Sequence, residues 1–239
     1  MALRRAGGIL AQAFKAAYEY IGILMLSNFV WFLVAFLPLL LVTMLPFPHP
    51  VFLLAGILGT VVLFGPATAG IHTVIFRLAS REEATLKHFY DGFRRHFGKA
   101  FLLTLVMGLI LGILVADLAF SIYHTNTWIR LLSGIWVYFI LFWGVVVQFV
   151  FPFLIQQDAG LLTILKRSSL VAMDNILVSL ILTLVNGVVL IVSVLLAAPI
   201  LLFATGLTAF VQHFALLELL KKYEQEQQGE NEIENGQGM

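Results

Sequence analysis

The sequence contains no cysteine and little charge. The absence of cysteine among its 239 residues excludes disulfide bonds, thiol catalysis and thiolate-bound zinc or iron–sulfur clusters. Only 11% of the residues are charged, whereas about a quarter are charged in soluble domains. The formal net charge of +1 is too small to indicate nucleic acid or another polyanion as a partner. The composition therefore excludes a soluble domain, and we expect no nucleic-acid binding.

What the sequence does contain is long apolar segments. Hydrophobic residues make up 61% of the chain, and the mean hydropathy is +0.99. No Asp, Glu, Lys or Arg occurs in residues 20–76 or in residues 175–217. A single helix over the first segment would extend about 85 Å, nearly three times the hydrocarbon core of a bilayer. Each segment must therefore cross a membrane twice, which predicts an all-α membrane protein.

Prolines mark the turns between paired spans, because proline lacks a backbone donor and disfavours helix in the residue before it. Pro46, Pro48 and Pro50 divide the first apolar segment, and Pro199 divides the last. We predict one transmembrane domain over residues 1–222 and a disordered polar tail over residues 223–239. The six predicted spans are residues 21–45, 51–78, 101–120, 131–156, 176–196 and 199–220.

The distribution of lysine and arginine predicts the orientation of these spans. Of the 14 Lys and Arg residues, Arg130 is the only one that falls on the side opposite the two termini. Cytoplasmic loops of membrane proteins carry an excess of Lys and Arg. We therefore expect a multi-pass membrane protein with both termini in the cytoplasm.

The loop after the second span has the pattern of a helix in the plane of the membrane. Ser80 and Glu83 have the spacing of a capping box, and aromatic residues then recur at helical spacing beside basic ones. We predict an interfacial helix over residues 82–98. Shorter amphipathic segments precede spans one and five, which suggests three repeats of a surface helix followed by a helical hairpin. The residues expected to contact lipid or a partner protein are Phe89, Phe93, Arg94 and Arg95.

Few strongly polar residues or helix-breaking prolines lie within the predicted spans. Polar groups at membrane depth are costly and usually face the interior of the helix bundle, and prolines there free backbone carbonyls that need partners. The alternative is that the polar groups simply form hydrogen bonds between packed helices. Gln212 and His213 are further polar residues, in the sixth span. A polar cavity is predicted at Asn28, Pro66, Thr68, His72, Gln148 and Asn186.

No motif of a known enzyme class is present. The sequence has no phosphate-binding glycine loop, no His-Glu-x-x-His pair and no nucleophile elbow. The spans also lack paired carboxylates. We therefore expect neither catalysis nor a cofactor or metal ion.

The most distinctive block of the sequence lies in its first half. It includes a Gly-Pro-Ala-Thr-Ala-Gly sequence that closes the second span, followed by aromatic and basic residues. The residues of the block are Ser27 to Trp31, Pro38, Gly65 to Gly70, Arg77, Leu78, Arg81 to Glu83, Phe89, Phe93, Arg94 and Phe97. This block resembles the YesL family of bacterial membrane proteins.

The second half resembles that family more loosely, through Asn175 and Pro199, and the likeness covers most of residues 10–222. The resemblance implies a bacterial cell (inner) membrane and an association with carbohydrate uptake, with no known catalytic residue.

Three functional hypotheses follow. The first is an accessory or regulatory partner of a carbohydrate importer, in contact with membrane lipid and with importer subunits or a second copy of itself. The second is a permease that moves a small solute through the polar cavity. The third is a membrane scaffold that transports nothing.

Overall fold

The computed structural model describes residues 2–46, 49–196 and 200–236, and its regular structure is helical, with no strand among these residues. Its elements are α1 (Ala2–Glu19), α2 (Ile21–Thr43), α3 (Pro50–Ala79), α4 (Leu86–Arg95), α5 (Phe97–Tyr123), α6 (Thr127–Leu131), α7 (Ser133–Gln157), α8 (Leu161–Asp174), α9 (Ile176–Leu196), a π-helical turn η1 (Ile200–Ala204) and α10 (Thr205–Gly236).

Six helical segments in the described part of the chain are long and apolar enough to span a membrane, which confirms the predicted all-α class with six spans. They are Ile21–Thr43, Pro50–Ala79, Phe97–Tyr123, Thr127–Gln157, Ile176–Leu196 and Leu202–Lys221.

The first predicted turn ends where α3 begins. The ring Nδ1 of His49 accepts the backbone N–H of Val51 at 3.3 Å, and Pro50 occupies the first helical position. This arrangement suits a helix start, because the first amides of a helix lack partners and proline has no amide to satisfy. Part of the first predicted turn, residues 47–48, lies outside the described residues. The second predicted turn, which contains Pro199, also lies outside them, at residues 197–199.

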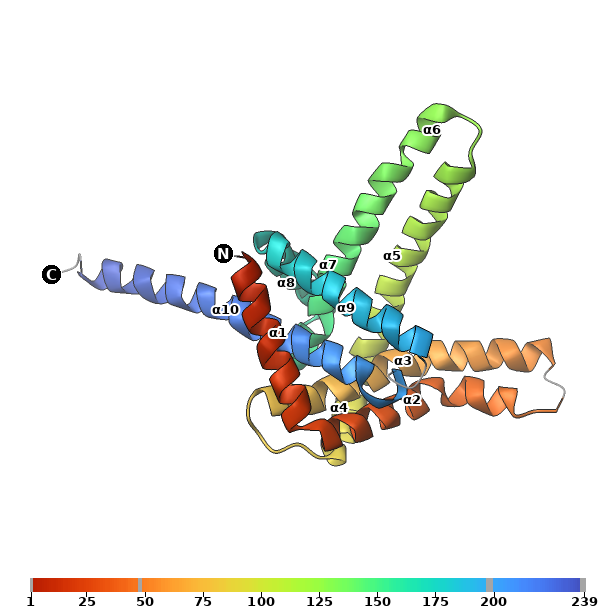
Figure 1. Ribbon diagram of the computed structural model, residues 1–239, viewed down its shortest axis with the longest axis horizontal. Helices are drawn as coiled ribbons and strands as arrows, with labels where there is room; N and C mark the ends of the chain where they lie inside the picture. The colour runs from red at the N-terminus through yellow and green to blue at the C-terminus, as the bar shows by residue number, and fades with distance from the viewer. Residues whose placement is uncertain (1, 47–48, 197–199, 237–239) are drawn as a thin grey trace.

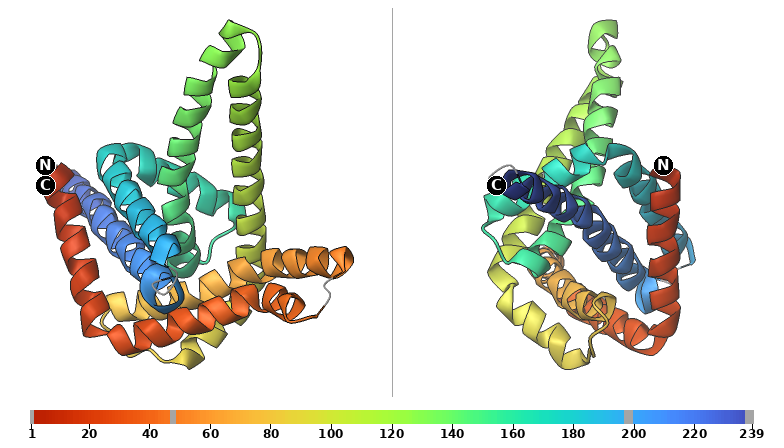
Figure 2. Two further views of the ribbon diagram at one scale, coloured as in Figure 1. Left: turned by 45° about the vertical axis from the view of Figure 1, so that its right-hand side comes forward. Right: turned by 90° about the vertical axis from the view of Figure 1, so that its left-hand side faces the viewer.

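Two helical hairpins extend in different directions from a common centre. In Figure 1 the α2–α3 hairpin points to the right and the α5–α7 hairpin points upward, and the left view in Figure 2 shows the same divergence. Large apolar side chains near the two tips are exposed, among them Leu54, Ile113 and Leu131. These outer halves therefore present an apolar surface of the kind that lipid covers.

The second half of α3 is the centre of the fold. Helix α3 contacts α2, α4, α5, α7 and α10. Every residue from Gly65 to His72 is buried, so this part of the helix is enclosed on all sides. Small residues dominate it because neighbouring helices can approach closely only where side chains are short.

A separate helix, α1, α4 or α8, precedes each of α2, α5 and α9 in the chain. The first of them, α1, buries the narrow apolar face formed by Ala6, Ile9 and Ala13. This helix packs against α9 and α10 and is followed directly by α2. The threefold repeat and the cytoplasmic placement of the termini stay predictions.

The predicted interfacial helix is shorter than expected and begins at a different cap. Ser80 ends α3 rather than starting the next helix, and Arg81 follows in a left-handed conformation with a φ of 63°. Helix α4 begins after Thr85, whose backbone N–H donates to the ring Nδ1 of His88 at 3.0 Å. The predicted Ser80–Glu83 capping box is therefore wrong, because α3 continues to Ala79 and the caps move downstream.

The backbone of the tail also differs from the expectation of disorder. Helix α10 continues past the last span to Gly236, and Figure 1 shows this end projecting away from the rest of the molecule. Residues 221–236 are rich in Lys, Glu and Gln, which have high intrinsic helix propensity.

Candidate functional site

Three glycines allow helices to approach α3 closely. A Cβ atom added at Gly65 would lie 2.5 Å from the carbonyl oxygen of Ala100 on α5. One added at Gly70 would lie 2.9 Å from the carbonyl oxygen of Phe89 on α4. A Cβ atom added at Gly92 of α4 would overlap the side chain of Thr73 on α3. The glycines therefore fix α4 and α5 against the centre of the fold.

A pair of buried histidines joins α3 to α10. The Nδ1 atom of His72 lies 3.2 Å from the Nε2 atom of His213, and the two side chains are at most 4% exposed. The His72 ring also stacks on Phe151 of α7 at a centroid distance of 5.3 Å, and the His213 ring lies 5.4 Å from Phe76. Two imidazoles in an aromatic surrounding thus form one hydrogen bond between helices.

Gln156 of α7 extends this contact to a chain of three side chains. Its Nε2 atom lies 3.3 Å from Nδ1 of His213. If the amide nitrogen donates there, Nδ1 of His213 is an acceptor, so its proton is on Nε2 and is donated to His72. If the amide is rotated so that its oxygen accepts, both imidazole tautomers reverse. The orientation of the Gln156 amide therefore determines which ring nitrogen of His213 and of His72 carries the proton.

Two of the polar residues predicted to line a cavity form hydrogen bonds to neighbouring helices. The side-chain oxygen of Asn28 accepts the backbone N–H of Gly206 at 2.9 Å, which ties α2 to the start of α10. The hydroxyl of Thr68 accepts the indole N–H of Trp31 at 3.1 Å and donates to the carbonyl of Phe64. These contacts agree with the alternative that intramembrane polar groups form hydrogen bonds between helices.

Gln148 and Asn186 are buried with part of their hydrogen-bonding capacity unused. The Gln148 amide donates to the carbonyls of Val145 and Ser179, but its oxygen has no hydrogen-bond partner among the described residues. Neither side-chain polar atom of Asn186 has a hydrogen-bond partner there. Pro66 and Pro152 lie within continuous α3 and α7.

The structure does not bring the six predicted cavity residues together around one of its measured hollows. Five hollows in the described part of the chain have volumes of about 170–370 Å³, and none of the five is lined by any of the six residues. The water-filled cavity stays a prediction.

An ionic cluster connects the α4–α5 junction to the loop after α7. Asp158 binds Lys99 at 2.8 Å and Arg95 at 3.2 Å, and its carboxylate lies 3.5 Å from Nδ1 of His96. The hydrogen bond from Lys99 is the main reason that the pKa of Asp158 lies below its ordinary value. Burial lowers the pKa of His96, although the nearby Asp158 carboxylate partly opposes that effect.

Asp158 was not among the residues predicted from sequence. It ends α7 in a left-handed conformation, with a φ of 42°. Asp and Asn tolerate that conformation better than most residues, so Asp158 two residues before Gly160 was a detectable signal for a helix end. Its three basic partners could not be foreseen, because the nearest lies 59 positions away in sequence.

The predicted surface residues of α4 are only partly at the surface. Phe89 is 4% exposed and packs against Gly70, so it is not available to lipid or a partner, and that prediction is wrong. Phe93 is half-buried and packs edge-to-face with Phe97, with ring centroids 5.5 Å apart. Arg94 and Arg95 are exposed. An apolar helix face that packs on the spans has the same sequence pattern as one that enters lipid.

No group of three or more potential metal ligands occurs among the described residues.

A protein-family model matches residues 24–118, and its description is 'Protein of unknown function, DUF624'. The match begins within α2, covers α3 and α4, and ends within α5. No curated protein and no solved structure matches the chain.

Proposed function

We propose that this protein is a non-catalytic, multi-pass partner of a bacterial carbohydrate uptake system and that it contacts importer subunits through α4. The proposal combines the association implied by the YesL resemblance with one structural observation. Helix α4 packs closely on α3 yet leaves an outer face of polar and aromatic side chains exposed. The exposed residues of that face are Lys87, Tyr90, Asp91 and Arg94.

The rigid attachment of α4 supports a docking role. Gly70 and Gly92 allow α4 to lie directly on α3, and the ion pair between Arg95 and Asp158 joins the end of α4 to the loop after α7. A surface that is ordered before binding loses little conformational entropy when a partner binds. Tyr90 is 58% exposed, and tyrosine and arginine are frequent among the residues that contribute most to protein interfaces.

The hydrogen bonds inside the spans favour this function over a permease. Asn28, Thr68 and Gln148 use their polar groups to join helices, whereas a permease needs such groups free to bind its solute. The excess of Lys and Arg beside α4 supports a cytoplasmic location for it in the bacterial inner membrane.

The proposal can be tested by affinity purification from the native membrane in a mild detergent, followed by mass spectrometry. The test variant combines Tyr90→Ala with Arg94→Gln, and both side chains are exposed. The matched control combines Tyr138→Ala with Arg130→Gln at the tip of the α5–α7 hairpin, where both side chains are also exposed.

We expect carbohydrate-importer subunits to be recovered with the wild type and with the control. Their recovery with the test variant should fall at least about tenfold, which corresponds to about 1.4 kcal/mol of binding free energy. Recovery of the protein without importer subunits would overturn the proposal, as would equal recovery with both variants. In that case solute flux in reconstituted vesicles would test the permease hypothesis, with Asn186→Leu as the variant.

A further inference from the structure

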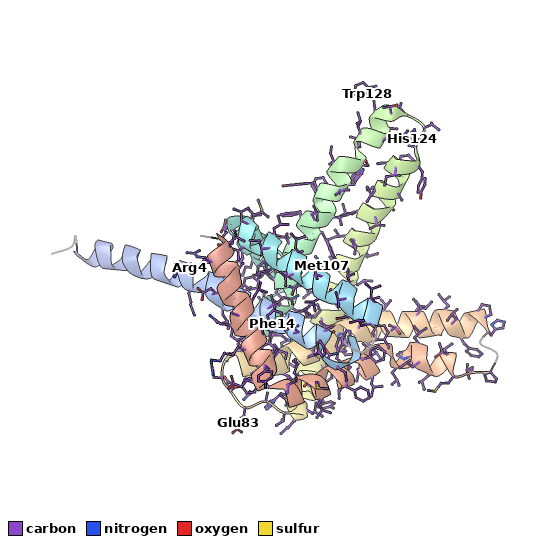
Figure 3. The ribbon with its side chains drawn as sticks, viewed as in Figure 1. Arg4, Phe14, Glu83, Met107, His124 and Trp128 are labelled. Atoms are coloured by element: carbon purple, nitrogen blue, oxygen red, sulfur yellow. The ribbon has the colours of Figure 1, made fainter. Side chains whose placement is uncertain are left out.

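A hollow of about 280 Å³ lies between α1 and α10, away from α4. Its walls combine two basic side chains of α1 with one acidic side chain of α10. Figure 3 labels Arg4 near the start of α1. The residues that line the hollow are Arg4, Arg5, Gly8, Ile9, Gln12 and Glu218.

The charges in this hollow are only partly neutralised by the protein. Glu218 lies 3.4 Å from the ammonium group of Lys221 and remains 41% exposed. The ion pairs between described residues include neither Arg4 nor Arg5. A guanidinium group presents paired donors that match the oxygens of a phosphate. The hollow therefore offers donors to an anion on one wall and an acceptor to a cation on the other.

Glu218 lies within one helical turn of Lys221, the last residue of the candidate span Leu202–Lys221. Charged side chains near the ends of spans reach the headgroup region of a bilayer, so we expect this hollow to lie near phospholipid headgroups. On the opposite wall, Ile9 is only 2% exposed. Leu3 and Phe14, on another face of α1, are 78% and 50% exposed.

We propose that this hollow binds the headgroup of a phospholipid that carries both a phosphate and a primary ammonium group, as phosphatidylethanolamine does. Arg4 and Arg5 bind the phosphate, and the carboxylate of Glu218 accepts a hydrogen bond from the ammonium group. The volume lies just below the range of about 300–1,000 Å³ that is typical of small-molecule sites. The hollow thus accommodates a headgroup while the acyl chains remain outside it.

The presence of Glu218 distinguishes this ligand from a simple anion. A carboxylate in the same hollow repels free phosphate and purely anionic lipids, whereas the ammonium group of the proposed headgroup compensates that charge. A quaternary ammonium, as in phosphatidylcholine, has no N–H to donate. The proposed order of affinity is therefore phosphatidylethanolamine first, then phosphatidylcholine and phosphatidylglycerol.

Native mass spectrometry of the full-length protein in detergent, titrated separately with the three lipids, tests the proposal. We expect retention of phosphatidylethanolamine to exceed that of the other two at least about fivefold. The double substitution Arg4→Gln and Arg5→Gln should reduce its retention about tenfold. Glu218→Gln should remove the preference for phosphatidylethanolamine over phosphatidylglycerol.

A pair of glycine substitutions separates the shape of the hollow from its charge. Gly8 lines the hollow and Gly7 does not, and a Cβ at either position meets no atom within 4 Å. Gly8→Leu should fill the hollow and reduce lipid retention at least about fivefold, whereas Gly7→Leu should retain lipid as the wild type does.

Three results would overturn the proposal. The first is wild-type retention in the Gly8→Leu variant. The second is a preference for phosphatidylglycerol that Glu218→Gln leaves unchanged, since that would indicate attraction of any anionic lipid. The third is displacement of the bound lipid by millimolar inorganic phosphate, which would indicate a site for free phosphate.

Discussion

Replacing Gly65 with alanine should destabilise the protein by forcing α5 away from α3. The new Cβ would lie 2.5 Å from the carbonyl oxygen of Ala100 and 2.5 Å from the hydroxyl of Thr104. The Thr104 hydroxyl can rotate away, but the Ala100 carbonyl belongs to the backbone of α5. Relief of that overlap therefore requires the two helices to separate by several tenths of an ångström.

The size of the effect follows from two opposing contributions. Overpacking a close contact costs about 1–3 kcal/mol, and the upper end applies here because no side-chain rotation can remove the clash with the carbonyl. Alanine is better than glycine by about 1 kcal/mol within a helix. The net loss is about 2 kcal/mol, or about 30-fold in the folding equilibrium. For a chain of this length that loss lowers the melting temperature by about 4–8 °C.

The measurement is thermal unfolding in detergent, followed by tryptophan fluorescence. The matched control is Gly108→Ala on α5, because a Cβ at Gly108 meets no atom within 4 Å. The control should melt at or slightly above the wild-type temperature. If Gly65→Ala also melts at or above the wild-type temperature, the close approach of α3 and α5 is refuted.

Two further predictions concern the histidine pair and the ionic cluster. A double-mutant cycle with His72→Phe and His213→Phe should give a coupling energy of about 0.6–1.7 kcal/mol in unfolding experiments, and zero coupling would contradict their contact. The hydrogen bond from Lys99 lowers the pKa of Asp158 below its ordinary 3.8, so the folded state favours the ionised carboxylate. The contribution of Asp158 to folding stability is therefore complete above pH 3.8 and is lost as the pH falls through the pKa of the folded state. Asp158→Asn should therefore lower the melting temperature at pH 7 and weaken its fall on acidification below pH 3.8, and an unchanged pH profile would contradict this role.

The spans and the most polar positions could be recognised from sequence for direct physical reasons. A bilayer excludes unpaired charge over about 20 residues of helix, so uncharged segments such as residues 20–76 predict crossings without knowledge of any contact. His72 was identified in the same way, because an imidazole within an apolar segment is costly unless it has a partner.

The contacts of those residues could not be inferred in this way. His72 meets His213 across 141 positions, and this contact depends on how α10 packs against α3. Phe89 illustrates the same limit, since lipid and a packed helix face are equally apolar surroundings and the pattern of α4 is compatible with both. The capping prediction at Ser80 was wrong because a local pattern competed with the continuation of α3 to Ala79.

Composition and the spacing of charges were thus sufficient to establish a helical membrane protein with six spans, because the cost of placing charge in hydrocarbon acts on each segment separately. Which polar groups meet, which faces are buried and where a hollow forms depends on how the helices pack. Packing depends on close approaches at residues such as Gly65 and Gly70, and on pairs such as Arg95 with Asp158. These involve segments far apart in the chain, so they are defined only when the whole chain has folded.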